Sequence, residues 1–194
     1  MDKDKCSVIS DIATMLLENN KEAAKTIICK EYPHFYFEVE KRAYTMAQKM
    51  QQFVKDGFID RYTGQKLLNP GMLKVISHYF PEEFPYHPHW KMTDTHMAYW
   101  ELVPTIDHIY PIAKGGHDDE KNWVTTSMKN NSIKSNYTID EIHWKLYPKG
   151  SIDDWNGLTS FFIELVDNDK ELLEDSYIKS WYKASKEVFL NHDL

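Results

Sequence analysis

The chain has 194 residues, of which 42% are hydrophobic, and a formal net charge of −7. This length and apolar content suit one core with appendages and exclude a disordered chain. The negative net charge argues against a protein that coats nucleic acid nonspecifically, because phosphates would repel much of its surface.

Two short helices are predicted at the start of the chain. Ser7 can cap the first, whose apolar residues fall at helical spacing and whose end is expected at Asn19 and Asn20. Asn19 and Glu22 have the spacing of a capping box for the second, which stops before Pro33. Together the two segments are expected to form a helical hairpin.

The cysteines and the apolar runs bear on the compartment. Cys6 and Cys29 are the only cysteines, which excludes a disulfide framework and fits a reducing compartment. No uninterrupted apolar run is long enough to span a bilayer, and the opening residues lack the apolar core of a secretion signal. We therefore expect a cytoplasmic protein with no membrane partner.

Three further elements are predicted before the middle of the chain. Residues 38–55 carry apolar side chains at spacings of three and four, which predicts a helix. Residues 58–68 are expected to form a hairpin with a central turn. Asn69 followed by Pro70 is a cap and first-turn signal for a helix that reaches about Tyr79.

A proline-rich loop without regular hydrogen bonding is predicted at residues 80–90. The histidines in and around it are His78, His87, His89 and His96. They could suggest a zinc site, but histidines with no cysteine and no clear ligand spacing more often serve in turns and packing. Trp90 and Lys91 could lie along a nucleic acid, where rings stack on bases, and an aromatic core is the alternative that we favour.

The most informative stretch begins with an apolar run that carries Asp107 and His108 side by side. The chain then breaks at Pro111 and turns through Gly115 and Gly116, which predicts a strand that leads into a loop. Neighbours on an ideal strand point to opposite faces, so Asp107 and His108 can serve one site only if the strand ends or is distorted there.

The second half of this stretch predicts a strand followed directly by a helix. After an acidic turn, Asn122 introduces a short β-branched run at residues 123–126. Ser127 then offers an N-cap for a helix that carries Asn131 and Lys134. The predicted order of the whole stretch is strand, loop, strand and helix.

The residue types in this stretch suit hydrolysis of a phosphodiester. Asp107 offers a hard anionic oxygen to a cation, and Asn131 offers a neutral oxygen from the helix. His108 can accept a proton near neutral pH. An oxygen-bound divalent cation beside a general base is what this reaction requires. The alternative is a hairpin and helix whose polar residues only cap and turn.

With these residues the stretch resembles the HNH endonucleases. Their ββα-metal unit reads Asp-His-Ile-x-Pro, then a Gly-Gly turn, an Asn before the second strand, and an Asn or His three residues ahead of a Lys. The resemblance implies that Asp107 and Asn131 are metal ligands, with Asn130 as the alternative ligand on the helix. It also implies that His108 is the general base, that Asn122 ties the loop down and orients the histidine, and that the product carries a 5′ phosphate.

The resemblance extends beyond the motif, with two departures. Residues 58–64, 84–88 and 99–102 also look like a group of bacterial HNH proteins of about this length. Many members of the family hold a structural zinc with two CxxC pairs, which this sequence lacks, so no structural zinc is expected and packing must replace it. Because the third signature position is Asn rather than His, the expected cation shifts from zinc or nickel toward Mg²⁺ or Mn²⁺.

Three helices are predicted after the central stretch. Thr138 and Glu141 have capping-box spacing for the first, Ser151 starts the second, and residues 177–190 form the last. From Ser151 onward the chain has ten acidic residues against four basic ones. This acidic part should weaken binding to random DNA without cancelling a local phosphate-binding surface, because screening in physiological salt is short-ranged.

The sequence thus predicts a mostly helical α+β protein, in which N-terminal helices (1–56) and C-terminal helices (138–194) wrap a nuclease core (57–137) in one compact domain. The predicted function is a Mg²⁺- or Mn²⁺-dependent HNH endonuclease acting on nucleic acid, with double-stranded DNA as the expected substrate. Lys134 could neutralise a neighbouring phosphate or pair internally with an acidic residue. The competing functions are an inactive nucleic-acid- or partner-binding module with the ββα shape and a structural zinc protein.

Overall fold

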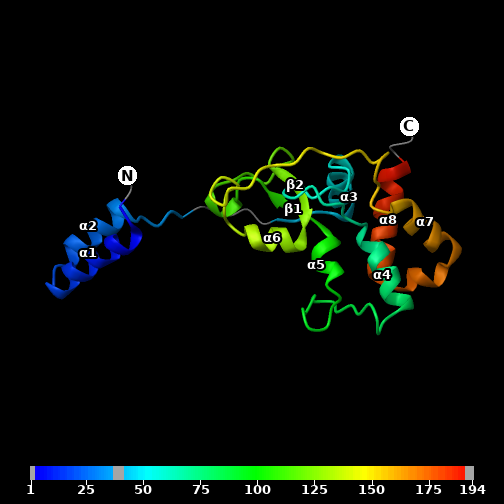
Figure 1. Ribbon diagram of the computed structural model, residues 1–194, viewed down its shortest axis with the longest axis horizontal. Coiled ribbons are helices and arrows are strands. Elements are labelled where there is room, and N and C mark those ends of the chain that lie inside the picture. Colours follow the sequence, from blue (N-terminus) through cyan, green and yellow to red (C-terminus); the bar gives the residue numbers. More distant parts are fainter. Residues whose placement is uncertain (1–2, 37–41, 191–194) are drawn as a thin grey trace. The chain divides into compact units, whose positions relative to one another are not determined.

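The computed structural model describes residues 3–36 and 42–190 (Figure 1). These residues form eight α-helices and one two-stranded antiparallel sheet, which confirms the mostly helical α+β class. Contacts divide the chain into two compact units, residues 1–38 and 39–194. The three-part division at residues 56 and 137 stays a prediction. Within the described ranges no helix is long and apolar enough to cross a membrane.

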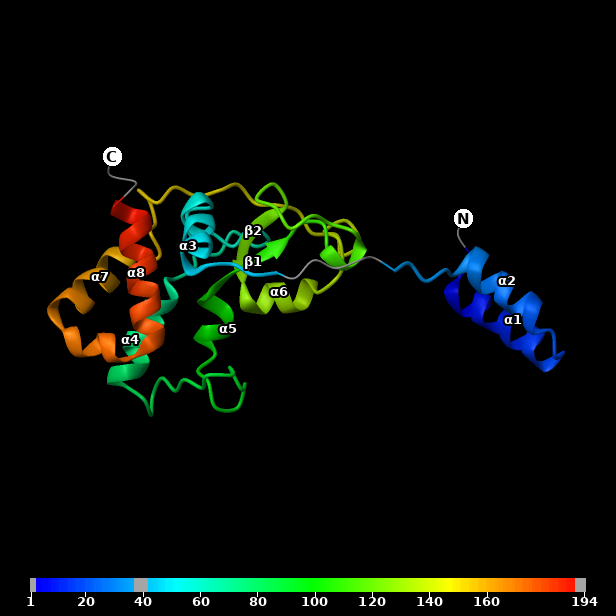
Figure 2. The same cartoon turned by 180° about the vertical axis from the view of Figure 1, so that it is seen from behind.

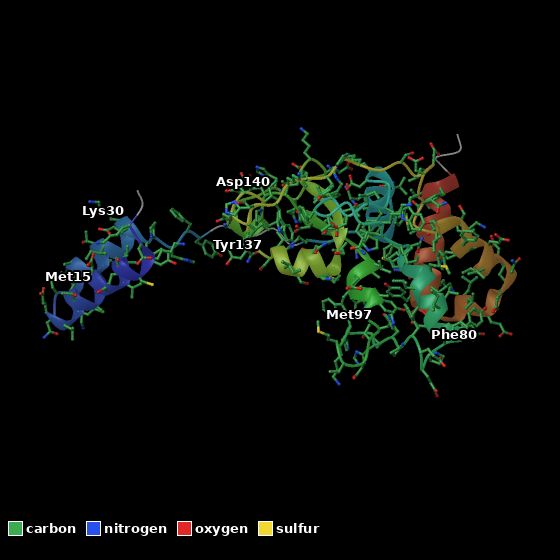
Figure 3. The ribbon with its side chains drawn as sticks, in the orientation of Figure 1. Met15, Lys30, Phe80, Met97, Tyr137 and Asp140 are labelled. Carbon is green, nitrogen blue, oxygen red and sulfur yellow. The ribbon has the colours of Figure 1, made fainter. Side chains whose placement is uncertain are left out.

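The first unit is a hairpin of α1 (Lys5–Leu17) and α2 (Lys21–Glu31), which pack against each other. Met15 of α1 and Lys30 of α2 are labelled in Figure 3. The caps differ from the prediction by a few residues. Asp4 caps α1 by accepting from the backbone N–H of Ser7, and Asn20 caps α2 by accepting from that of Ala23. Ser7 is therefore a capped residue rather than the cap, because a cap lies before the first turn.

The second unit contains the remaining elements, and of its first two helices α3 departs from the prediction at its start while α4 agrees with it. Helix α3 runs over Met46–Lys55, where Thr45 and Gln48 form a capping box. The predicted start at Glu38 lies outside the described residues, and residues 42–45 are not helical. Helix α4 (Pro70–Tyr79) begins after the predicted cap Asn69, whose side chain accepts from the backbone N–H of Gly71.

The predicted strand, loop, strand and helix are confirmed. Strand β1 (Pro104–His108) pairs with β2 (Trp123–Ser127), and α6 (Met128–Lys134) follows directly. The Ser127 hydroxyl caps α6 by accepting from the backbone N–H of Asn130. The loop holds a short 3₁₀ turn, η1 (Ile112–Lys114). Helix α6 lies beside both strands in the two opposite views (Figures 1 and 2).

The other face of the sheet closes onto the main core. Ile106 of β1 is buried in one cluster with Met50 and Phe53 of α3 and Trp181 of α8 (Ser176–Leu190). Burial of this many apolar side chains is the main force that joins the elements. Helix α4 lies beside α8, and α7 (Thr159–Asn168) and η2 (Lys170–Glu174) complete this side (Figure 2).

Two of the three predicted C-terminal helices are wrong in place or kind. Thr138 and Glu141 do form the hydrogen bonds of a capping box, but only turns follow, and His143 adopts a φ of 55° that no α-helix continues through. The helix predicted to start at Ser151 begins at Thr159 instead, after Leu158 at a φ of 59°. The last helix is confirmed as α8.

The proline-rich segment between α4 and α5 (Ala98–Leu102) has no helix or strand, as predicted. Phe80 and Met97, at its two ends, are exposed (Figure 3). The rings of Phe84, Tyr86 and Trp90 pack inward, in the pairs Phe84–His96, Tyr86–Tyr99 and Trp90–Tyr99. The aromatic-core interpretation of this loop is therefore confirmed.

A buried carboxylate joins the residue 58–68 hairpin to α6. The hairpin forms through a bridge between Ile59 and Lys66, and Asp60 within it is 0% exposed. Its two oxygens accept hydrogen bonds from four donors, namely the backbone N–H groups of Tyr62 and Ser127, the Thr126 hydroxyl and the Asn130 amide. Packing was expected to replace the structural zinc, and this expectation omitted the hydrogen-bonded carboxylate of Asp60.

Candidate active site

Asp107 lies near the end of β1 with its carboxylate almost fully buried. Its Oδ2 accepts from the Tyr62 hydroxyl at 2.6 Å and lies 3.0 Å from Lys134 Nζ. Burial, and then the charge and hydrogen bond of Asp107, raise the pKa of Tyr62, so the hydroxyl keeps its proton and donates. No described residue hydrogen-bonds Asp107 Oδ1, which leaves one carboxylate oxygen for a ligand.

Lys134 is a fully buried cation that ties α6 to the end of β1. Its Nζ donates to the backbone oxygen of His108 at 2.7 Å as well as contacting Asp107. A buried ammonium needs both an opposite charge and hydrogen-bond acceptors, and these two groups supply them. Of the two interpretations of Lys134, the structure thus shows the internal pairing with an acidic residue.

His108 has a separate set of partners. Its Nε2 lies 2.8 Å from Asp118 Oδ1 and 3.2 Å from the Tyr44 hydroxyl. The register of the sheet pairs His108 with Trp123 and Asp107 with Val124, without a bulge. The side chains of Asp107 and His108 therefore hydrogen-bond different residues, as expected for neighbours on a regular strand.

The Tyr44 hydroxyl contacts both His108 and Asp118. Burial is the main cause of its raised pKa, the hydrogen bond and charge of Asp118 add to it, and the charge of Asp107 adds further, against a lowering by Arg42. The Tyr44 hydroxyl therefore keeps its proton and donates a hydrogen bond to Asp118.

Asn122 closes the loop between the two strands. Its Oδ1 accepts from the backbone N–H of Tyr110, and its Nδ2 donates to the backbone oxygens of Tyr110 and His117. Gly116 sits within this closure, where a Cβ would lie 2.1 Å from the Tyr110 oxygen. Asn122 thus makes the loop contacts expected of it, and it reaches His108 only through the backbone.

The structure distinguishes the two asparagines of α6. The Asn130 side chain is buried and donates to Asp60, so it is used inside the protein. The Asn131 side chain is partly exposed, one turn before Lys134, and no described residue hydrogen-bonds it. No hydrogen bond joins Asn131 to Asp107 or His108, so their pairing at a metal stays a prediction.

The donor set fits a hard cation rather than a soft one. Within the described part of the chain, no group of three or more His, Cys, Asp or Glu side chains is placed to hold a metal ion. Among the proposed ligands, the oxygens that no described residue hydrogen-bonds are Asp107 Oδ1 and the amide oxygen of Asn131. Mg²⁺ is commonly held by one or two protein oxygens while it keeps several waters, so these residues fit it.

Sequence reasoning missed three residues that surround the site, Tyr44, Tyr62 and Asp118. Tyr62 belongs to a segment assigned to a turn, Asp118 to an acidic turn, and Tyr44 to a segment assigned to a helix. The contact of Tyr44 with His108 spans 64 residues and that of Tyr62 with Asp107 spans 45, whereas Asp118 lies 10 residues after His108 in an irregular loop. No local signal could have found them.

Comparison with protein families gives one match, in which residues 93–139 match the model described as HNH endonuclease. This stretch is therefore similar to an HNH endonuclease unit. It contains the whole strand, loop, strand and helix with all five predicted site residues, and it covers less than half of the chain. Comparison with curated proteins and with solved structures gave no match. The HNH unit associates the chain with nuclease chemistry on nucleic acid.

Proposed function

We propose that this protein is an endonuclease that hydrolyses phosphodiester bonds of double-stranded DNA with the help of Mg²⁺ or Mn²⁺. The observation that carries the proposal is the HNH unit at residues 93–139, folded with Asp107 and His108 at the end of β1 and Asn131 on α6. The two cysteines are free and exposed, which fits a reducing, cytoplasmic location.

In this proposal His108 is the general base. The neutral imidazole takes a proton from water, and the resulting hydroxide attacks the phosphorus in line with the leaving 3′ oxygen, which leaves a 5′ phosphate. Asp107 Oδ1 and the Asn131 amide oxygen would hold the divalent cation. When bound, the cation would stabilise the negative charge that develops during the reaction.

Two side chains, the buried Lys134 and the partly exposed Asn122, keep the proposed site in shape. Lys134 holds Asp107 Oδ2 and the His108 backbone oxygen, so it acts on the reaction through these two residues. Asn122 closes the loop that follows His108. Neither side chain needs to touch the substrate in order to matter for the rate.

The second candidate is a nucleic-acid- or partner-binding module that keeps the ββα shape without turnover. The observation that favours it is that Asp107 is paired with Lys134 and that His108 Nε2 is engaged by Asp118. If the protein is a nuclease, Asp107 Oδ1 must be enough to bind the cation and His108 Nδ1 must be enough to accept the proton.

Incubation with supercoiled plasmid separates the two candidates. With Mg²⁺ or Mn²⁺ the protein should convert the plasmid to nicked and linear forms, because the cation completes the site. Adding EDTA should stop the conversion. Gel electrophoresis measures it, and intact plasmid under both metals, at protein in excess over DNA, would favour the binding module.

Metal binding by Asp107 can be tested without cleavage. In the wild-type protein Mg²⁺ or Mn²⁺ should raise the melting temperature, since a ligand that binds the folded state stabilises it. Asp107→Asn should abolish this rise and keep the hydrogen bonds from Tyr62 and Lys134. Asp107→Ala should also abolish it, but at a cost of about 3–5 kcal/mol, because it leaves Lys134 and Tyr62 without the acceptor oxygen that asparagine keeps.

Differential scanning fluorimetry provides the measurement, and Glu120→Gln provides the control. This substitution also removes one negative charge, from the loop between the strands, and the Glu120 side chain is 72% exposed. An Asp107→Asn protein with the full metal response would reject Asp107 as a ligand.

A further inference from the structure

Three donors from separate parts of the chain converge on one oxygen of Asp118. Its Oδ1 lies 2.8 Å from His108 Nε2, 2.7 Å from the Tyr44 hydroxyl and 2.8 Å from Trp123 Nε1. The Asp118 side chain is only 12% exposed and that of His108 only 3%. Although Asp118 belongs to a loop, these contacts fix its carboxylate beside the imidazole ring.

The carboxylate can only accept from these groups. Burial favours its neutral form, but the hydrogen bonds from Tyr44, His108 and Trp123 outweigh burial and lower the pKa of Asp118. An ionised carboxylate has no proton to donate. A neutral imidazole in this position therefore carries its one proton on Nε2, toward Asp118, and its lone pair on Nδ1.

Nδ1 is the ring nitrogen that remains for chemistry. In the described ranges, no residue hydrogen-bonds His108 Nδ1. A general base needs an unprotonated nitrogen that faces the proton it takes, so a flipped ring or the other tautomer would be inactive. We infer that Asp118 is a positioning residue that fixes the orientation and the tautomer of His108, and that Nδ1 accepts the proton. The inference rests on the proposed nuclease function and adds a residue to it.

Tyr44 and Trp123 support the same geometry one contact further out. Their rings meet edge to face with centroids 5.0 Å apart, and Trp123 is the register partner of His108. Both donate to the oxygen that holds the imidazole, so they limit the movement of Asp118. Tyr44→Phe removes one of the three donors and should reduce cleavage less than loss of the carboxylate does.

Long-range ¹H–¹⁵N spectra of the ¹⁵N-labelled full-length protein test the assignment, because they report which ring nitrogen is protonated. The chain has nine histidines, so the His108 signals are those missing from His108→Ala. The wild-type ring should show the proton on Nε2. Asp118→Ala should give a mixture of tautomers and lower kcat for plasmid cleavage at least about tenfold, with little change in KM.

Asp118→Asn separates geometry from charge. Its amide oxygen can take the place of Oδ1 and accept from all three donors, so it should keep the wild-type tautomer and recover most of the kcat lost in Asp118→Ala. Glu120→Gln is again the matched control, since it removes a charge from the same loop without touching His108. It should change neither the tautomer nor kcat.

A wild-type ring protonated on Nδ1 would overturn the inference, and so would an Asp118→Ala protein with the wild-type tautomer and the wild-type kcat. The wild-type spectrum decides which nitrogen is protonated even if Asp118→Ala does not fold. A wild-type protein that cuts no DNA with either cation would overturn the proposed function instead, while the spectra would still show whether Asp118 sets the tautomer.

Discussion

Replacing His108 with alanine is expected to lower the rate of plasmid cleavage by about 10²–10⁴-fold, the usual contribution of a general base. The structure places the imidazole at the end of β1, buried to 3% exposure and held through Nε2 by Asp118. The described hydrogen-bond partners of the ring are Asp118 and Tyr44, neither of which is an imidazole, so alanine removes the proposed base without a matched substitute. Single-turnover cleavage at saturating Mg²⁺ measures the effect.

The control for this prediction is that the metal site should survive. The proposed ligands Asp107 and Asn131 are untouched, so Mg²⁺ should raise the melting temperature of His108→Ala as much as that of the wild-type protein. Loss of cleavage together with a retained metal response identifies a chemical role for the histidine. Cleavage at the wild-type rate would reject His108 as the base and leave the HNH unit without its proposed mechanism.

A large loss of stability is expected from Asp60→Ala, which removes the carboxylate that joins the hairpin to β2 and α6. Four donors lose their acceptor inside the protein, and each buried donor left unpaired costs about 1–3 kcal/mol before relaxation. We expect the free energy of unfolding to fall by about 3–5 kcal/mol, a large part of the stability of a typical domain. Urea denaturation followed by tryptophan fluorescence measures it.

Two further variants qualify this prediction. Asp60→Asn keeps one acceptor oxygen, which can take the place of Oδ2 and serve its three donors. Only the hydrogen bond to Oδ1 is lost, so the free energy of unfolding should fall less than in Asp60→Ala. Asp140→Asn removes a charge from the exposed segment after α6, shown in Figure 3, and should change the unfolding midpoint very little. If Asp60→Ala unfolded at the same urea concentration as Asp140→Asn, the Asp60 carboxylate would not be what stabilises the contact of the hairpin with β2 and α6.

Local patterns in the sequence predicted much of the site's backbone. Asn69 and Ser127 cap the helices that they were expected to cap, because a cap bonds a backbone N–H only two or three residues away. The order of strand, loop, strand and helix follows from the alternation of apolar residues with Pro, Gly and Asn. The capping box of Thr138 and Glu141 also forms, but no helix follows, since local bonds start a helix and tertiary packing sustains it.

By itself, the sequence determined the set of residues that we propose for the chemistry: an aspartate and a histidine at a strand end, an asparagine before the second strand, and an asparagine and a lysine on the next helix. Only the tertiary structure decided what each of them touches. It paired Lys134 with Asp107, placed Asp118 and Tyr44 on His108, and left the Asn131 side chain without a hydrogen bond to any residue in the described ranges. The reason is distance along the chain. A side chain's long-range neighbours depend on how whole elements pack, and no spacing in the sequence encodes a contact such as that of Tyr62 with Asp107, 45 residues apart.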